Sequence, residues 1–144
     1  MSTIERSSLK AARGYISSRP IMGDRVPQRV QNIVIKEYCT RVKLDYLLSA
    51  TEMAQRSSYR MLMSLVESPE HRFSHLAFYS IGQLPISHEQ RRDVLMRIFE
   101  QGRKVFCCVE DITLSDESDI EEVDNFFAIR SLEVDADLLR SLKL

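Results

Sequence analysis

GYISSRPIMGDRVPQRVQN (residues 14–32) joins a short strand, a polar loop and the start of a helix. The strand is expected over 14–17, and the loop after it contains Ser18, Arg19 and Arg25. Pro27 suits the first position of a helix, because its missing N–H would be unpaired there anyway. Helix N-termini attract anions through free N–H groups and the helix dipole, and arginines add charge-assisted hydrogen bonds. The stretch therefore predicts an anion-binding loop, without indicating a reaction.

The rest of the chain alternates short apolar runs with amphipathic stripes. Further strands are expected over 44–48, 75–80 and 105–109, and helices over 27–42, 57–68, 87–102, 120–129 and 134–144. Alternating strands and helices indicate a parallel sheet with right-handed crossovers. We therefore predict an α/β fold, an open parallel sheet of about four strands in the order 2-1-3-4, flavodoxin-like or resolvase-like, with helices on both faces.

The composition limits the class of protein. A chain of 144 residues is expected to form one domain, and a net charge of −1 argues against a nucleic-acid partner, because phosphate neutralisation requires a basic excess. Three cysteines, two of them adjacent at 107 and 108, do not form a disulfide framework, which favours a reducing cytoplasm. No apolar run approaches the roughly 20 residues that span a bilayer, so no membrane insertion is expected.

Three regions are expected along the chain: a flexible N-terminal arm (1–12), a single α/β domain (13–130) and a C-terminal helical tail (131–144). The tail has an apolar stripe formed by Val134, Leu138, Leu139 and Leu142. A stripe of this kind either packs back onto its own chain or forms a contact between copies, so a homo-oligomer is expected.

The candidate site lies where the strand order reverses, beyond the carboxyl ends of the first and third strands. Ser18 is the candidate nucleophile and Glu52 the candidate general acid or base. The alternatives are that Ser18 only satisfies local backbone and that Glu52 is a solvated carboxylate. The expected ligand-binding residues are Ser17, Arg19, Arg25, Gln28, Ser49, Thr51, Ser80 and Gln83. Neither a metal-ligand spacing nor a dinucleotide or Walker-type motif is present, so no metal and no cofactor are expected.

Several segments resemble the sporadic carbohydrate cluster protein family. They are RGYISSRPIMGDRVPQRVQNIVIKEYC (13–39), LDYLLSATEMA (44–54), YRMLMSLVE (59–67), AFYSIGQLP (77–85) and FCCVED (106–111). The most specific blocks are SRPIMGDRVPQ (18–28) and LSATE (48–52). The resemblance covers about residues 13–127 and implies a role in a bacterial surface-polysaccharide cluster, for O-antigen (lipopolysaccharide) or capsule, with no assigned reaction.

The element order also resembles, more weakly, the catalytic domain of serine recombinases. In that family the first strand has a Y-x-R-V-S pattern that ends in the nucleophile, and a later loop has an L-D-R-L-x-R pattern. Here Tyr15 matches, but Ser17 stands at the arginine position and Arg19 at the serine position, and the loop SIGQLPI (80–86) contains no arginine. The resemblance implies a shared fold and a reused anion pocket rather than recombination.

Three functional hypotheses follow. The preferred one is a cytoplasmic protein of surface-polysaccharide biosynthesis that binds a phosphorylated sugar or nucleotide-sugar, with Arg19 and Arg25 as anion clamps. Whether it transforms the ligand is left open; Ser18 and Glu52 would carry any chemistry. The second is a non-catalytic partner or regulator of another polysaccharide-pathway enzyme, and the third is a recombinase-like DNA protein.

Overall fold

The computed structural model describes residues 10–53, 59–67 and 72–142 and contains a five-stranded sheet in the order β2-β1-β3-β4-β5. The strands are β1 (Ala11–Ser17), β2 (Asp45–Glu52), β3 (His75–Phe78), β4 (Lys104–Cys107) and β5 (Ile112–Leu114). The first four pair in parallel, which confirms the expected α/β class and the expected order 2-1-3-4. β5 adds an edge strand antiparallel to β4.

β5 was not expected, because the turn before it lacks the glycine or Asn-Gly signal of a hairpin. Asp111 takes the left-handed conformation that the turn needs, with φ of 55°. Aspartate tolerates this conformation better than most residues, so the chain reverses without glycine.

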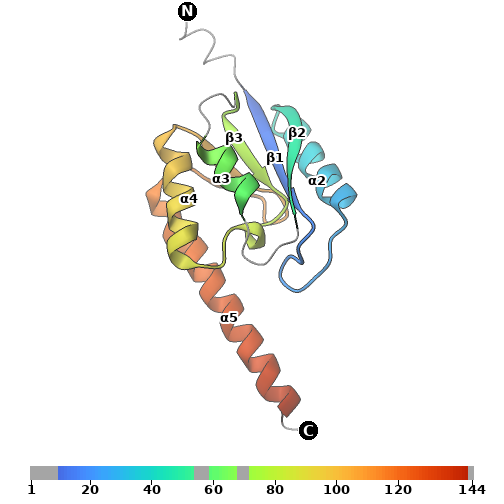
Figure 1. Cartoon of the computed structure of the whole chain (residues 1–144), viewed down its shortest axis with the longest axis vertical. Coiled ribbons are helices and arrows are strands. Elements are labelled where there is room, and N and C mark those ends of the chain that lie inside the picture. Colours follow the sequence, from blue (N-terminus) through green and yellow to red (C-terminus); the bar gives the residue numbers. More distant parts are fainter. Residues whose placement is uncertain (1–9, 54–58, 68–71, 143–144) are drawn as a thin grey trace, which may run out of the picture.

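Helices cover both faces of the sheet (Figure 1). They are α2 (Gln28–Arg41), α3 (Arg60–Glu67), α4 (His88–Glu100) and α5 (Ile120–Leu142), with short 3₁₀ turns η1 (Ile81–Gln83) and η2 (Glu117–Asp119). α2 alone forms one apolar cluster with its face of the sheet, whereas α3, α4 and the start of α5 share the cluster on the other face. Of the predicted stripe of α4, Val94, Leu95 and Ile98 are buried as expected, and Phe99 is partly buried against the same cluster.

α2 is rotated relative to the stripe that its sequence indicates. Val30, Ile33 and Val42, which we expect to face the core, are 41%, 60% and 38% exposed. Cys39, also part of the expected stripe, is buried as predicted, but the other buried positions are Gln31, Ile35 and Tyr38. The physical reason is the side chain of Gln31, whose hydrogen bonds to β1 fix which face of the helix points inward.

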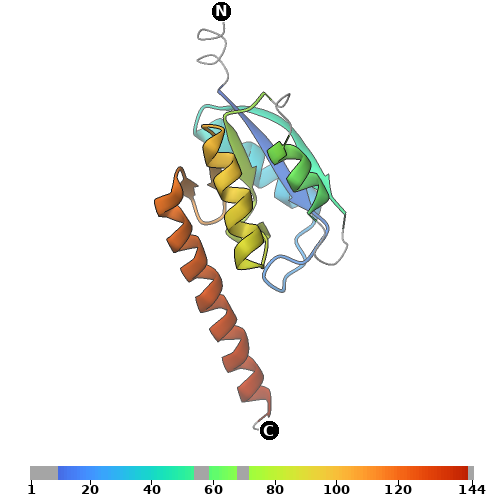
Figure 2. The same cartoon turned by 60° about the vertical axis from the view of Figure 1, so that its left-hand side comes forward.

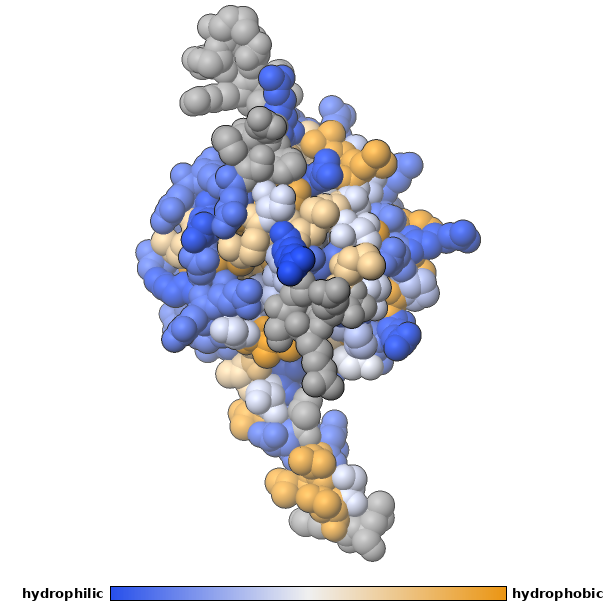
Figure 3. Space-filling model, in the orientation of Figure 1, coloured by the Kyte–Doolittle hydropathy of each residue, from blue (hydrophilic) through white to orange (hydrophobic). Residues whose placement is uncertain are grey.

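α5 is one continuous helix whose C-terminal part projects away from the sheet (Figures 1 and 2). The two separate helices expected over 120–129 and 134–144 are therefore wrong. Leu138, Leu139 and Leu142 are 58%, 60% and 73% exposed on its far end, where apolar surface gathers (Figure 3). No helix within the described ranges is both long enough and apolar enough to cross a membrane.

At the other end of the chain, β1 begins at Ala11 rather than Gly14, so residues 11 and 12 belong to the strand and not to the expected arm. Ala12 is completely buried, and Ala11 nearly so, which explains why this short apolar pair joins the sheet. Residues 1–9 of the arm, and the expected start of the second helix at residues 57 and 58, lie outside the described residues.

Candidate functional site

Beneath the loop that follows β1 lies a buried network of amide groups. β3 pairs with β1 only as far as Tyr15, and the N–H of Ser18 points the other way, to the carbonyl of Glu52 in β2. The N–H and C=O of Ser17 therefore face a place where the neighbouring strand has already ended. The side chain of Gln31, in α2, takes the role of the missing strand: its Oε1 accepts from Ser17 N at 3.0 Å, and its Nε2 donates to Ser17 O at 2.8 Å.

Gln83 in η1 extends this network to the loop after β3. Its Nε2 donates to Gln31 Oε1 at 3.0 Å, and its Oε1 accepts from the N–H of Ser80 at 3.2 Å. Gln31 Nε2 also donates to the carbonyl of Val26, just before α2. The side chains of Ser17, Gln31 and Gln83 are almost completely buried, so they support the two loops at the switch point from below.

Glu52 lies at the end of β2 and is 3% exposed, which excludes the solvated carboxylate considered from the sequence. Its Oε1 accepts from the hydroxyl of Tyr15 at 2.8 Å and from the N–H of Leu62 at 3.2 Å. Its Oε2 accepts from the N–H of Met61 at 2.9 Å. These N–H groups belong to the first turn of α3, so the carboxylate anchors the start of that helix to the sheet.

Arg19 contacts Tyr15, the residue that donates to the Glu52 carboxylate. Its Nη2 donates to the hydroxyl of Tyr15 at 3.0 Å, and its guanidinium lies 4.2 Å from the ring centre of Tyr59. Burial raises the pKa of Tyr15 well above its usual value, so the phenol stays protonated and donates to Glu52 while it accepts from Arg19. Arg19 therefore contacts the β2–α3 side of the sheet.

Two other predicted residues lie away from the switch point. The hydroxyl of Ser49 is 2.6 Å from that of Tyr46, which also donates to Asn32 Oδ1 at 3.0 Å. Thr51 is exposed on β2, the edge strand. The expected convergence of Ser49 and Thr51 on the site is therefore not seen.

Ser80 holds the loop after β3 through a carboxylate that sequence reasoning missed. Its hydroxyl donates to Glu110 Oε2 at 2.8 Å, and the N–H of Ile81 donates to Glu110 Oε1 at 2.9 Å. Glu110 follows β4, so the two loops meet at the same edge of the sheet. The dense acidic run of this region concealed the glutamate that holds this loop.

Two hollows open beside the loop that follows β1. The smaller, of about 260 Å³, lies at the start of α2 and is lined by Ser18, Arg25, Val26, Pro27 and Gln28. The larger, of about 420 Å³, lies at the switch point, between this loop, the loop after β3 and α5. Its lining is Pro20, Met22, Gly23, Gly82, Ile86, Phe127, Arg130, Ser131 and Asp135.

The smaller hollow has the features of an anion site. Pro27 caps α2 without a side-chain hydrogen bond, and the first turn contains no acidic residue. Among the residues that the structure describes, Arg25 forms no ion pair. Arg19 and Arg25 are expected to contact the same anion, but only Arg25 lines this hollow. Ser18, Arg25 and Gln28 are the predicted residues that the structure brings together.

Comparison with known proteins supports the fold at the level of solved structures. The chain is similar to a resolvase family site-specific recombinase from Streptococcus pneumoniae, with a TM-score of 0.61 and 11% identity over 92% of this chain and 96% of that one. It is also similar to the N-terminal catalytic domain of TP901-1 integrase, with a TM-score of 0.56 and 15% identity over 92% and 99% of the two chains. No family model and no curated protein matches the sequence.

These findings confirm the resolvase-like fold and correct one expectation from the sequence. The near-neutral charge predicts no nucleic-acid partner, yet both neighbours come from proteins of nucleic-acid recombination. Exclusion of nucleic acid on net charge alone is therefore wrong, because a fold of this kind is compatible with such a partner. The resemblance to the sporadic carbohydrate cluster family receives no support from these comparisons.

Proposed function

We propose that this protein binds a phosphorylated sugar or nucleotide-sugar in bacterial surface-polysaccharide biosynthesis, with the phosphate in the hollow lined by Ser18, Arg25 and Gln28. The observation that carries the proposal is that one hollow combines Arg25, which has no ion-pair partner among the described residues, with a helix start that has no side-chain cap. An N-terminal helix turn and a guanidinium both favour a phosphate, the first through oriented N–H groups and the second through bidentate hydrogen bonds.

We also propose membership of the sporadic carbohydrate cluster family, because its two most specific blocks correspond to structural devices in this chain. The block 18–28 contains the whole loop after β1, including the left-handed Met22 and Gly23 and the helix cap at Pro27. The block 48–52 ends in Glu52, the anchor of α3. Each block thus contains residues whose conformation or contacts support the loops around the site.

The test is calorimetric titration with UDP-glucose, glucose 1-phosphate and UDP. Arg25→Ala should weaken binding of the best probe by about tenfold or more, since a hydrogen bond to a charged group contributes about 1.5 to 3 kcal/mol. Arg25→Lys should recover only part of the loss, because an ammonium cannot make the bidentate contact. Arg29→Ala is the matched control, since Arg29 lies in the first turn of the same helix but outside this hollow. Equal loss in both variants, or none in either, would refute the assignment.

A second candidate ligand is the phosphodiester backbone of DNA, which the likeness to recombinase structures favours. The same titration with a short DNA duplex separates the two. Backbone binding should weaken steeply as salt is raised, because counterions are released, whereas a single phosphate in a shaped pocket should show a shallow salt dependence. If the protein binds the duplex but no sugar phosphate, the ligand of this site is nucleic acid and the sugar-phosphate proposal is refuted.

A further inference from the structure

α5 reaches across to the tip of the loop that follows β1. Ile21 and Asp24 close a tight turn there, with Ile21 N donating to Asp24 O at 2.8 Å and Asp24 N donating to Ile21 O at 3.0 Å. The two central residues, Met22 and Gly23, have φ of 52° and 83°. Arg130 of α5 donates from Nη2 to the carbonyl of Met22 at 2.7 Å, across 108 positions of sequence.

The turn is also held from the side of β3. A β-carbon on Gly82 would lie 2.7 Å from Met22 Cγ, so the Met22 side chain packs directly on the backbone of η1. The base of α5 is itself fixed, because Arg91 of α4 donates from Nε and Nη2 to Asp124 and lies over the ring of Phe127. The larger hollow lies between these contacts.

We propose that Arg130 is a positioning residue that holds the loop in its ligand-binding shape, so that the docking of α5 and the conformation of the loop are coupled. A left-handed non-glycine residue is strained, and the charge-assisted hydrogen bond to its carbonyl offsets that strain. Arg25 follows Met22 by three residues, so a shift of the turn moves the arginine assigned to the phosphate. By linkage, a ligand that orders the loop favours docked α5, and a partner that draws α5 away loosens the loop.

Hydrogen exchange of the apo protein tests this coupling without any ligand. The amides of Ile21 and Asp24 report on the turn directly, because both donate within it. In Arg130→Ala they should exchange about tenfold faster, which corresponds to about 1.4 kcal/mol, while amides in β1 and β3 keep their rates. Arg130→Lys should restore part of the protection.

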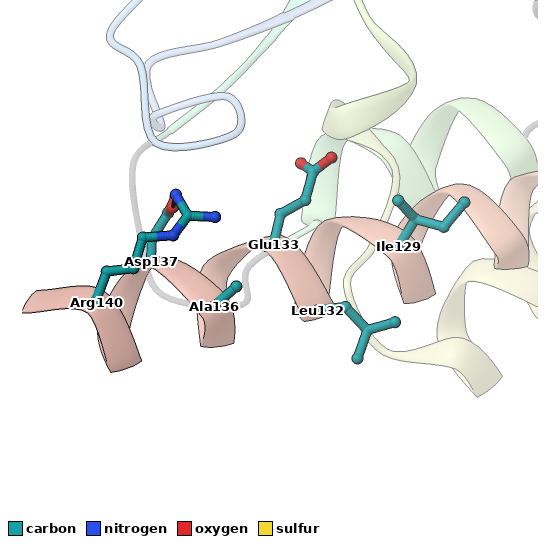
Figure 4. Close-up of a pocket in the computed structure, with 6 residues that line it drawn as sticks. All are labelled: Ile129, Leu132, Glu133, Ala136, Asp137 and Arg140. Atoms are coloured by element: carbon teal, nitrogen blue, oxygen red, sulfur yellow. Dashed lines mark hydrogen bonds and ion pairs between the residues drawn. The ribbon is translucent and has the colours of Figure 1, made fainter.

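Two variants of α5 serve as controls. Arg130 Nη1 also pairs with Glu133 at 3.3 Å, and Glu133→Gln removes that pair without touching Met22. Arg140 pairs with Asp137 at 3.1 Å further along the helix (Figure 4), so Arg140→Ala removes a pair of the same kind that lies away from the loop. Both should leave the exchange of Ile21 and Asp24 unchanged. Unchanged exchange in Arg130→Ala, or equal acceleration in the controls, would overturn the proposal.

The claim that Arg130 affects ligand binding rests on the proposed phosphate site. Titration with UDP distinguishes a failure of that site from a failure of the coupling between α5 and the loop. Arg130→Ala should raise the dissociation constant of UDP several-fold with an unchanged melting temperature of the apo protein, a result that a purely structural role would not give. Arg25→Ala should weaken UDP binding by about tenfold or more, yet leave the exchange of the turn as in the wild type. If the wild type does not bind UDP while the exchange results hold, the phosphate site fails and the coupling of α5 to the loop stands. If Arg130→Ala binds UDP as the wild type does, Arg130 is no positioning residue for that site.

Discussion

Replacement of Glu52 tests whether this buried carboxylate supports the fold or is held for chemistry. Glu52 accepts hydrogen bonds from Tyr15, Met61 and Leu62. Glu52→Ala leaves one hydroxyl and two backbone N–H groups without their acceptor, and an unsatisfied buried donor costs about 1–3 kcal/mol. Because the losses share one site and are not additive, we expect the free energy of unfolding to fall by about 3–5 kcal/mol. Glu52→Gln keeps one acceptor oxygen for some of these three donors, so we expect about half of that loss in the free energy of unfolding.

The assay is urea unfolding followed by circular dichroism, with the slope of the transition compared between proteins to verify a common two-state mechanism. Thr51→Ala is the matched control, because Thr51 is the exposed neighbour of Glu52 on the same edge strand. Glu52→Ala within about 0.5 kcal/mol of Thr51→Ala would refute the anchoring role. Removal of a purely catalytic carboxylate is commonly neutral or stabilising, so the sign of the change separates the two roles.

Two further predictions concern the sheet. Gly14→Ala should lower the free energy of unfolding, measured in urea, by about 1–3 kcal/mol, because a β-carbon at this position meets the Ser49 hydroxyl that contacts Tyr46. Adding Ser49→Gly to this variant should restore part of the lost stability. No loss of stability in Gly14→Ala would contradict the close contact between Gly14 and Ser49. The pKa of His75 is lowered by burial and by the charge of Lys104, so its contribution to stability is complete above the ordinary pKa and is lost as the pH falls toward the lowered value. Unfolding free energies from about pH 7 to about pH 5.5 should therefore fall more steeply in the wild type than in His75→Phe, which keeps the stacking on Phe106; parallel curves would show that His75 does not titrate in this way.

The sheet could be predicted from the sequence because its signals are local. The apolar runs at Leu76–Phe78 and Val105–Cys107 are buried strands in the expected order, and Ser87 caps α4 through the amide of Gln90 as its sequence indicates. β5 could not be predicted, since its turn depends on a left-handed Asp111 rather than on glycine. The continuity of α5 was also hidden, because the polar residues Arg130, Ser131 and Glu133 separate its two apolar stretches in the sequence.

The sequence indicates the loop that lines the smaller hollow, but only part of what surrounds it. Ser18, Arg25 and Gln28 share a hollow because they flank the start of one helix, and this proximity is visible in the sequence. The partners of Glu52 and Ser80 come from α3 and from the end of β4, at sequence separations that no local pattern encodes. Arg130 is more than a hundred residues from its partner, Met22. Contacts of this kind are set by the packing of whole elements, so sequence reasoning finds the loop and misses what holds it.

Gln31 shows how one polar residue can decide both the orientation of a helix and the state of a site. Its side chain is completely buried and makes hydrogen bonds to Ser17, Val26 and Gln83. An amide that must satisfy four bonds in one place allows α2 a single rotation, which explains why Val30 and Ile33 are left exposed although their spacing suits a core. The same bonds tie the loop after β1 to η1, so the two loops at the switch point form one rigid support. The tip of the loop lies outside this network and is held separately, by the hydrogen bond from Arg130 to the carbonyl of Met22.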